Sequence, residues 1–124
     1  MATTDVIEQA ITGHGAWRTI LLHAMETGTS SIDIARAKRD DRCELGKWLY
    51  READAADRRS PSYARVRELH QAFHVKAAQV LDLALQGRKA EAEAAMAMRS
   101  PYASASAALT AALKAWREGV GVGV

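Results

Sequence analysis

The residues of this sequence whose types and spacing favour zinc binding are three of its four histidines and its single cysteine, spread over three segments. His70 and His74 lie four residues apart, about 40° apart around a helix, so both imidazoles can reach the same ion. His14 and Cys43 lie far upstream of this pair. Three neutral histidines and one thiolate fill the tetrahedral shell of zinc. The sequence therefore predicts a zinc site that ties three segments together.

Each of these residues also has an ordinary structural explanation. Histidines on an apolar helix face can be core residues satisfied by hydrogen bonds or water, and a lone cysteine is most often a small buried hydrophobic residue. Cys43, however, is expected near a helix N-terminus, where the amides and the helix dipole favour the thiolate that a metal requires. His23 is expected to face solvent, because it lies roughly 180° from His14 around the same helix. It is left out of the predicted site.

Apolar residues recur at the three- and four-residue spacing of helix faces, and strand signals are almost absent. A first helix is expected over residues 5–27, with His14 and Trp17 on its apolar face and Gly28 at its end. The polar segment that follows, 29–40, predicts a long connection with Ile32 and Ile34 as its anchors.

Residues that favour helix ends place the next two helices. Asp41 and Glu44 form a predicted capping box for a short second helix, with Cys43 in its first turn. Ser60 followed by Pro61 predicts the start of a long third helix that carries both downstream histidines and ends near residue 87.

The alanine-rich segment after residue 87 predicts the last helical part of the chain. Pro101 interrupts its apolar stripe, so either one helix kinks there or Ser100 caps a fresh helix with Pro101 in its first turn. Glycine alternates with valine over residues 119–124, which predicts a flexible tail. The domain itself is expected to span residues 1–118.

Together these elements predict an all-α fold: a four-helix bundle of the up-down type, with a short second helix and a zinc site inside the bundle. Trp17 and Trp48 are expected to support the site as a hydrophobic wall that limits the access of water. Gly46 is expected to permit a close approach of helices beside it. Four protein ligands leave no position for a catalytic water, so an enzyme is not expected.

Length and composition limit the function classes. A chain of 124 residues is long enough for one domain with a core, and a single cysteine excludes an internal disulfide framework. A formal charge of +2, from 17 basic and 15 acidic residues, gives no argument for a nucleic-acid partner. Without a run of about 18 apolar residues, membrane insertion is not expected. No secretion signal is visible, so the chain is expected to be cytoplasmic.

The residues that could bind and support a metal ion also follow the pattern of a known family. In order they are His14-x-x-Trp17, Cys43-x-Leu45-Gly46-x-Trp48 and His70-x-x-x-His74. This arrangement resembles the bacterial chemoreceptor zinc-binding domain, abbreviated CZB. The resemblance implies a helical bundle that holds one zinc ion per subunit through the three histidines and the cysteine. It also implies a regulatory role, because such domains occur on soluble chemoreceptors and diguanylate cyclases and respond to zinc or to oxidants such as hypochlorous acid.

The leading hypothesis is a free-standing regulatory domain that senses zinc, or oxidants through Cys43. It would signal through protein contact in bacterial chemotaxis or cyclic-di-GMP pathways, as a homodimer or with a chemoreceptor or diguanylate cyclase type partner. The signalling or cyclase domain usual in the family is not expected in this chain, because the bundle and its tail take up residues 1–13 and 75–124. The alternative is a structural zinc bundle that acts as an interaction or dimerisation module. An enzyme or haem-type bundle would need an open coordination position, which four ligands do not leave.

Replacing His70 or His74 with alanine is expected to abolish zinc binding and to lower stability, because the free energy of binding to the folded state adds to that of folding. His23→Ala should do neither. Zinc content and thermal unfolding of these variants and of His14→Ala measure this. The assignment of helix faces would be wrong if His23→Ala lost zinc while His14→Ala kept it.

Overall fold

The structure is a computed structural model that describes residues 3–39, 43–53 and 55–122. Within these residues the chain is helical and contains no strand, which confirms the expected all-α class. In chain order the helices are α1 (Thr3–Gly15), α2 (Trp17–Thr27), α3 (Ile34–Lys38), α4 (Glu44–Lys47), the π-helix η1 (Trp48–Glu52), α5 (Ala55–Arg59), α6 (Pro61–Leu85), α7 (Lys89–Ala95) and α8 (Pro101–Val122).

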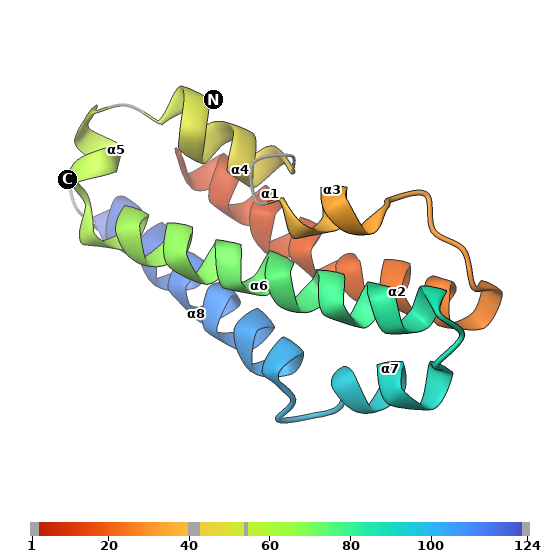
Figure 1. Ribbon diagram of the computed structural model, residues 1–124. Helices are drawn as coiled ribbons and strands as arrows, with labels where there is room; N and C mark the ends of the chain where they lie inside the picture. Colours follow the sequence, from red (N-terminus) through yellow and green to blue (C-terminus); the bar gives the residue numbers. More distant parts are fainter. Residues whose placement is uncertain (1–2, 40–42, 54, 123–124) are drawn as a thin grey trace.

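Three long rods form the centre of the fold, and they are the nearly collinear pair α1 and α2, then α6, then α8 (Figure 1). α6 packs against α8, α2 and α3, while α8 also packs along α1. The short helices lie around these rods: α4 contacts α1, and α7 contacts α2 and α6. α6 is therefore the element around which the other helices are arranged.

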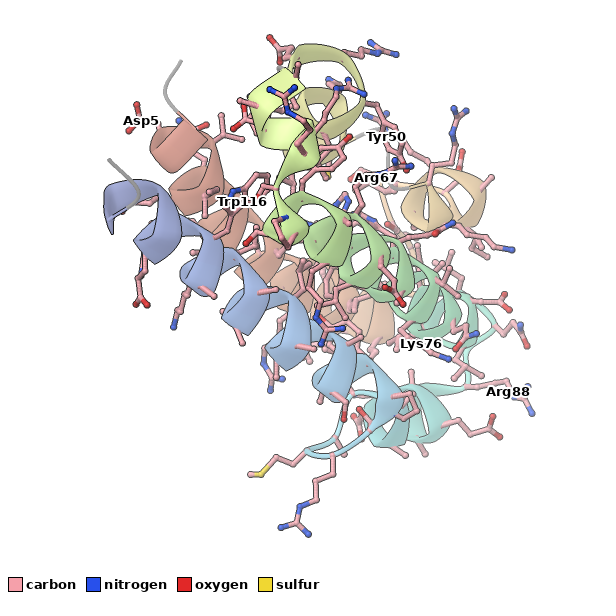
Figure 2. All side chains as sticks on the ribbon, turned by 90° about the vertical axis from the view of Figure 1, so that its left-hand side faces the viewer. Asp5, Tyr50, Arg67, Lys76, Arg88 and Trp116 are labelled. Atoms are coloured by element: carbon pink, nitrogen blue, oxygen red, sulfur yellow. The ribbon has the colours of Figure 1, made fainter. Side chains whose placement is uncertain are left out.

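The core lies between the long rods. Among its largest fully buried side chains are Ile7 of α1, Phe73 of α6 and Leu113 of α8, so each rod contributes one apolar face. Charged side chains such as Asp5 and Arg88 lie on the outside (Figure 2). Burying one such apolar side chain stabilises the fold by about 1.5–3 kcal/mol. The amphipathic spacing in the sequence thus becomes the force that holds the helices together.

The first helix is broken at Ala16 and does not run unbroken over residues 5–27 as expected. The amide of Ala16 donates to the carbonyl of Gly13 at 3.2 Å, which makes a tight turn. α2 then continues in nearly the direction of α1 (Figure 1). Gly13 and Gly15 lie just before the break and both lower helix propensity, which is its physical reason. The break comes directly after His14.

The expected connection over residues 29–40 contains a short helix, α3, which the sequence analysis did not predict. Asp33 has extended backbone, and its carboxylate accepts the amide of Arg36 at 2.7 Å. Aspartate is a strong N-cap residue, so this bond stabilises a turn that apolar periodicity alone does not indicate. Ala37 of this helix is buried against the core.

The expected second helix is α4 continued by η1. Cys43 is the residue before α4, not a residue of its first turn, and its carbonyl accepts the amide of Lys47 at 2.9 Å. Its sulfur accepts the amide of Gly46 at 3.4 Å. Cys43 therefore occupies the N-cap position itself. The cap predicted for Asp41 lies outside the described residues.

Serine side chains start both of the long downstream helices. The hydroxyl of Ser60 accepts the amide of Ser62 at 3.2 Å and begins α6, which confirms the predicted start. The hydroxyl of Ser100 accepts the amide of Ala103 at 3.1 Å, and Pro101 is the first residue of α8. Of the two alternatives at this proline, the structure has the fresh helix.

Helix α8 runs to Val122, beyond the domain boundary expected at residue 118. The structure describes the first four residues of the expected tail as helix, and residues 123–124 lie outside the described part. The division of the chain at residue 118 stays a prediction. No helix among the described residues is both long and apolar enough to cross a membrane.

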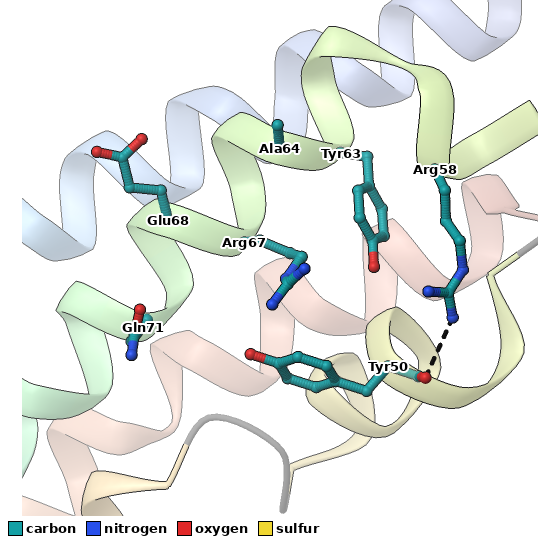
Figure 3. A pocket seen from close by; sticks show the side chains of 7 residues that line it. All are labelled: Tyr50, Arg58, Tyr63, Ala64, Arg67, Glu68 and Gln71. Carbon is teal, nitrogen blue, oxygen red and sulfur yellow. Dashed lines mark hydrogen bonds between the residues drawn. The ribbon is translucent and has the colours of Figure 1, made fainter.

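Side chains from α5 and α6 hold the end of η1. Arg58 donates from Nε to the carbonyl of Ala53 at 2.9 Å and from Nη2 to the carbonyl of Tyr50 at 3.1 Å (Figure 3). The hydroxyl of Tyr63 donates to the carbonyl of Leu49 at 2.6 Å. Carbonyls at the end of a helix have no helical donor, so these bonds supply what the backbone lacks.

Arg58→Ala is expected to loosen the end of η1, because two carbonyls lose their donors. The free energy of unfolding should fall by about 1 kcal/mol, and amide exchange over residues 50–53 should become faster. Denaturant unfolding and hydrogen exchange measure these two effects. Arg59→Ala, which removes an exposed charge one residue away, is the matched control. Equal effects of the two variants would contradict this role of Arg58.

Candidate metal centre

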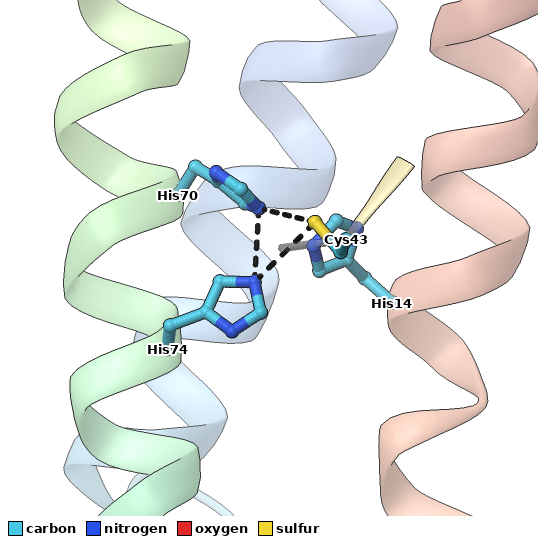
Figure 4. Close-up of side chains that lie close together, drawn as sticks. All are labelled: His14, Cys43, His70 and His74. Atoms are coloured by element: carbon cyan, nitrogen blue, oxygen red, sulfur yellow. Dashed lines mark hydrogen bonds between the residues drawn. The ribbon is translucent and has the colours of Figure 1, made fainter. Parts of the chain in front are cut away.

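Four side chains from separate elements converge on one point in the core (Figure 4). His14 comes from the end of α1, Cys43 precedes α4, and His70 and His74 lie one turn apart on α6. One donor atom from each lies within 4.8 Å of the others. The structure thus brings together all four residues that the sequence singled out, while His23 is exposed and lies outside the cluster.

The distances between the donor atoms fit a tetrahedral ion. The sulfur of Cys43 lies 3.1 Å from Nε2 of His70 and 3.7 Å from Nε2 of His74, and the two Nε2 atoms are 2.9 Å apart. Around zinc, tetrahedral donors lie about 3.3 Å apart for two nitrogens and about 3.6 Å apart for nitrogen and sulfur. These three donors therefore need only small adjustments to bind zinc, and the donor atom of His14 lies within 4.8 Å of them.

The tautomer of His14 leaves a lone pair for a metal. Its Nδ1 lies 2.8 Å from the carbonyl of Ala10, and since a carbonyl can only accept, Nδ1 carries the proton. Nε2 is then an acceptor, and it is buried without a hydrogen-bond partner. A buried acceptor in this state costs about 1–3 kcal/mol. A core histidine satisfied by hydrogen bonds does not describe His14, whereas a metal ligand does.

The same logic fixes His74, this time through α3. Its Nδ1 lies 3.0 Å from the carbonyl of Ala37 and donates to it, so Nε2 carries the lone pair that faces Cys43. Hydrogen bonds of this kind orient histidine ligands and raise their basicity. The carbonyls of Ala10 and Ala37 were missed by the sequence analysis, because every residue has a carbonyl and no side-chain type indicates which one will face a histidine.

His70 is the most deeply buried donor and has the least support. It is fully buried, and its Nδ1 has no hydrogen-bond partner. Its ring lies edge-on to that of His74, with centroids 4.5 Å apart. Nε2 of His74 carries a lone pair and lies 2.9 Å from Nε2 of His70. Nε2 of His70 must therefore either donate a proton to Nε2 of His74 or share a cation with that atom. The two Nε2 atoms thus face each other across either a proton or a cation.

Burial keeps the histidines neutral. It lowers the pKa of His14 from 6.5 to about 4, with a smaller lowering from the charge of His74 and an opposing effect of the Ala10 carbonyl. Burial also lowers the pKa of His70 far below its ordinary value, and charges on His74 and His14 add to this. A neutral imidazole is the form that binds a metal, so protons do not compete for these nitrogens near pH 7.

Aromatic rings enclose the histidines. The ring of Trp17 lies edge-on to that of His74, with centroids 5.7 Å apart, as the expected hydrophobic wall requires. Phe73, which the sequence analysis did not assign to the site, lies 5.1 Å from the ring of His14. Its place on the apolar face of α6, next to His74, was the available signal. Such rings lower the local dielectric and exclude water from the donors.

The other two expected supports take different positions. The ring contact of Trp48 is with Trp116 of α8 at 5.6 Å, and among the described residues no ring contact joins it to a histidine of the cluster. Trp48 thus packs α4 and η1 against α8. Gly46 is buried and acts through its backbone, because its amide donates to the sulfur of Cys43. An N–H donor stabilises a thiolate, which is the state of sulfur that binds zinc.

The metal-free chain is expected to lose stability in mild acid. Histidines titrate near 6.5 in the unfolded chain, whereas the pKa of His14 in the folded chain is about 4. Below pH 6.5 the unfolded state therefore binds protons that the folded state does not, so the free energy of unfolding falls as the pH drops from about 6.5 towards 4. Urea unfolding of chelator-treated protein across this range measures it. His14→Phe should weaken the dependence, and a flat profile would contradict the burial of neutral histidines.

Comparison with known proteins agrees with this geometry. Residues 14–81 match the family model described as the chemoreceptor zinc-binding domain. The matched segment begins at His14 and contains the other three donors. No curated protein and no solved structure matches the chain. Since the family model covers more than half of the 124 residues and the donor set is complete, the chain belongs to the chemoreceptor zinc-binding (CZB) domain family.

Proposed function

We propose that this chain is a zinc-binding regulatory domain in which His14, Cys43, His70 and His74 hold one zinc ion per subunit. The observation that carries the proposal is the convergence of four donor side chains on one point. In His14 and His74, a hydrogen bond from Nδ1 to a backbone carbonyl leaves Nε2 unprotonated and able to bind a metal. Bound zinc would supply a closed tetrahedral link between α1, α4 and α6. We do not propose an enzyme, because four protein donors leave no position for a catalytic water.

The proposed architecture is the up-down four-helix bundle, with the short α4 and η1 as its second member. Its support is the packing of α6 against α8 and α2, and of α8 along α1. Trp48 adds to this, since it joins the short member to α8 through Trp116. The zinc donors then lie inside the bundle, on three of its members.

Cys43 is the proposed point at which a stimulus acts. It is partly exposed, whereas the three histidines are buried. It is also the one donor that can be oxidised to sulfenic and sulfinic acid, forms that do not bind zinc as a thiolate does. A change in zinc level and an oxidant would therefore both change whether zinc is bound to the sulfur of Cys43.

The element that responds is α4 with η1. α4 has four residues, and a helix this short depends on tertiary anchoring. Its anchors are the sulfur of Cys43 and the buried side chains of Leu45 and Leu49. Loss of the sulfur anchor would free α4 while α6 keeps its long packed face, which is the two-state behaviour that a switch requires.

The signal is proposed to leave by protein contact, either within a homodimer or with a chemoreceptor or diguanylate cyclase type protein. The support is membership of the CZB family, and the pathways in view are bacterial chemotaxis and cyclic-di-GMP signalling. A cytoplasmic location stays a prediction. A structural zinc bundle would have the same ligands but no response at Cys43.

Treatment of the zinc-loaded chain with one equivalent of hypochlorous acid is expected to release zinc and to raise amide exchange over residues 43–52, while residues 61–85 stay protected. Metal analysis and hydrogen exchange on the same samples measure this. Met98 is exposed and can also be oxidised, so oxidised Cys43→Ser protein, compared with the same variant before treatment, is the control for methionine. Full retention of zinc with unchanged protection of α4 would leave the structural bundle as the better description.

A further inference from the structure

A cavity leads from the surface to the metal centre. It has a volume of about 150 Å³ and reaches two of the four donors, Cys43 and His74. Its lining residues are Gly13, Trp17, Ile20, Ile32, Arg36, Arg39, Cys43 and His74. At about 30 Å³ per molecule this space holds about five waters, so it admits small molecules only.

A second cavity of about 390 Å³ shares Arg36 and Arg39 with the first. Its other lining residues are Ala35 and Lys47, so three of its four lining residues are cationic. Among the described residues, no acidic side chain lines either cavity. The carboxylate of Asp33, on the same short helix as Arg36, is turned to the helix start, where it accepts a backbone amide. The way to the sulfur therefore passes between cationic side chains.

Charge at the mouth of a narrow cavity acts on the rate at which molecules enter it. A cleft lined by one sign of charge focuses the field and raises the local concentration of ions of the opposite sign. Arg36 belongs to both cavities and extends from α3, whose first turn is fixed by the Asp33 cap.

We propose that Arg36, which lines both cavities, forms an anion-attracting entrance to the metal centre, through which small anionic thiol-reactive molecules reach Cys43 faster than cationic ones of similar size. This inference rests on the proposed function in one respect, that Cys43 is where a stimulus acts. It adds the chemical class of molecule that the site admits and the residue that selects it.

Two methanethiosulfonate reagents test the entrance, one with an anionic sulfonatoethyl group and one with a cationic trimethylammonioethyl group. In both, the sulfur of Cys43 attacks the sulfenyl sulfur, a disulfide forms, and methanesulfinate leaves with the electron pair. Cys43 is the single cysteine of the chain, so the gain in intact mass reports on this residue alone. Rates on the zinc-loaded folded chain are divided by rates on the urea-unfolded chain, which removes the intrinsic difference between the reagents.

The normalised rate for the anionic reagent is expected to exceed that for the cationic reagent by about tenfold at low salt. The ratio should fall towards one at about 1 M salt, where the screening length is about 3 Å, and this series needs no variant. Arg36→Gln should lower the low-salt ratio by about threefold, and Arg36→Lys should preserve most of it. Arg65→Gln is the matched control, because Arg65 is an exposed arginine that lines a separate cavity beside α8.

Equal normalised rates for the two reagents at low salt would overturn the proposal, and so would equal losses in Arg36→Gln and Arg65→Gln. Zinc release is measured on the same samples and reports on the proposed function separately. Zinc that stays bound after Cys43 is modified would contradict Cys43 as the responsive ligand and leave the charge preference standing. Zinc release without a charge preference would contradict the entrance alone.

Discussion

The structure depends on the burial of three imidazoles around one point in the core. His14 and His74 are oriented by backbone carbonyls, and Nε2 of His70 lies 2.9 Å from Nε2 of His74. Lone pairs at this distance repel unless a positive charge lies between them. Burial makes protonation of His14 and His70 costly, because it lowers the pKa of both. A metal cation relieves the repulsion without placing a proton in the core.

The departures from regular helical structure gather around this constraint. The chain turns at Ala16 directly after His14, and α3 brings the carbonyl of Ala37 to His74. At the start of α4, the sulfur of Cys43 takes the place of a capping side chain and faces the histidines. Each irregular feature therefore either presents a donor or orients one. The long helices supply the apolar core that holds these features in place.

The four donors differ in how exposed they are and in how firmly their helices are packed. The histidines lie inside the packed core, whereas Cys43 is partly exposed, precedes a four-residue helix and lines a cavity with two arginines. A reagent from solvent therefore meets the sulfur first, and the element attached to the sulfur has the least packing of its own. Cys43 is therefore both the donor that reagents reach first and the donor attached to the least packed helix, as a regulatory site requires.

Residue types and local spacing determined much of this protein. The i, i+4 histidine pair, the lone cysteine and the apolar stripes predicted the helical class and the four residues that the structure brings together. Ser60 predicted a helix start that the structure confirms, and at Ser100 the structure has one of the two predicted alternatives. These features depend on neighbours within a few residues along the chain. The carbonyl partner of His74, the contact of Trp48 with Trp116 and the arginines beside Cys43 were decided by tertiary structure alone. The Ala37 carbonyl and Trp116 are distant in sequence from the residues they contact, so only the packing of helices against one another could bring them together. Arg36 and Arg39 are near Cys43 in sequence, but the cavity that they share with it also needs residues of α2 and α6.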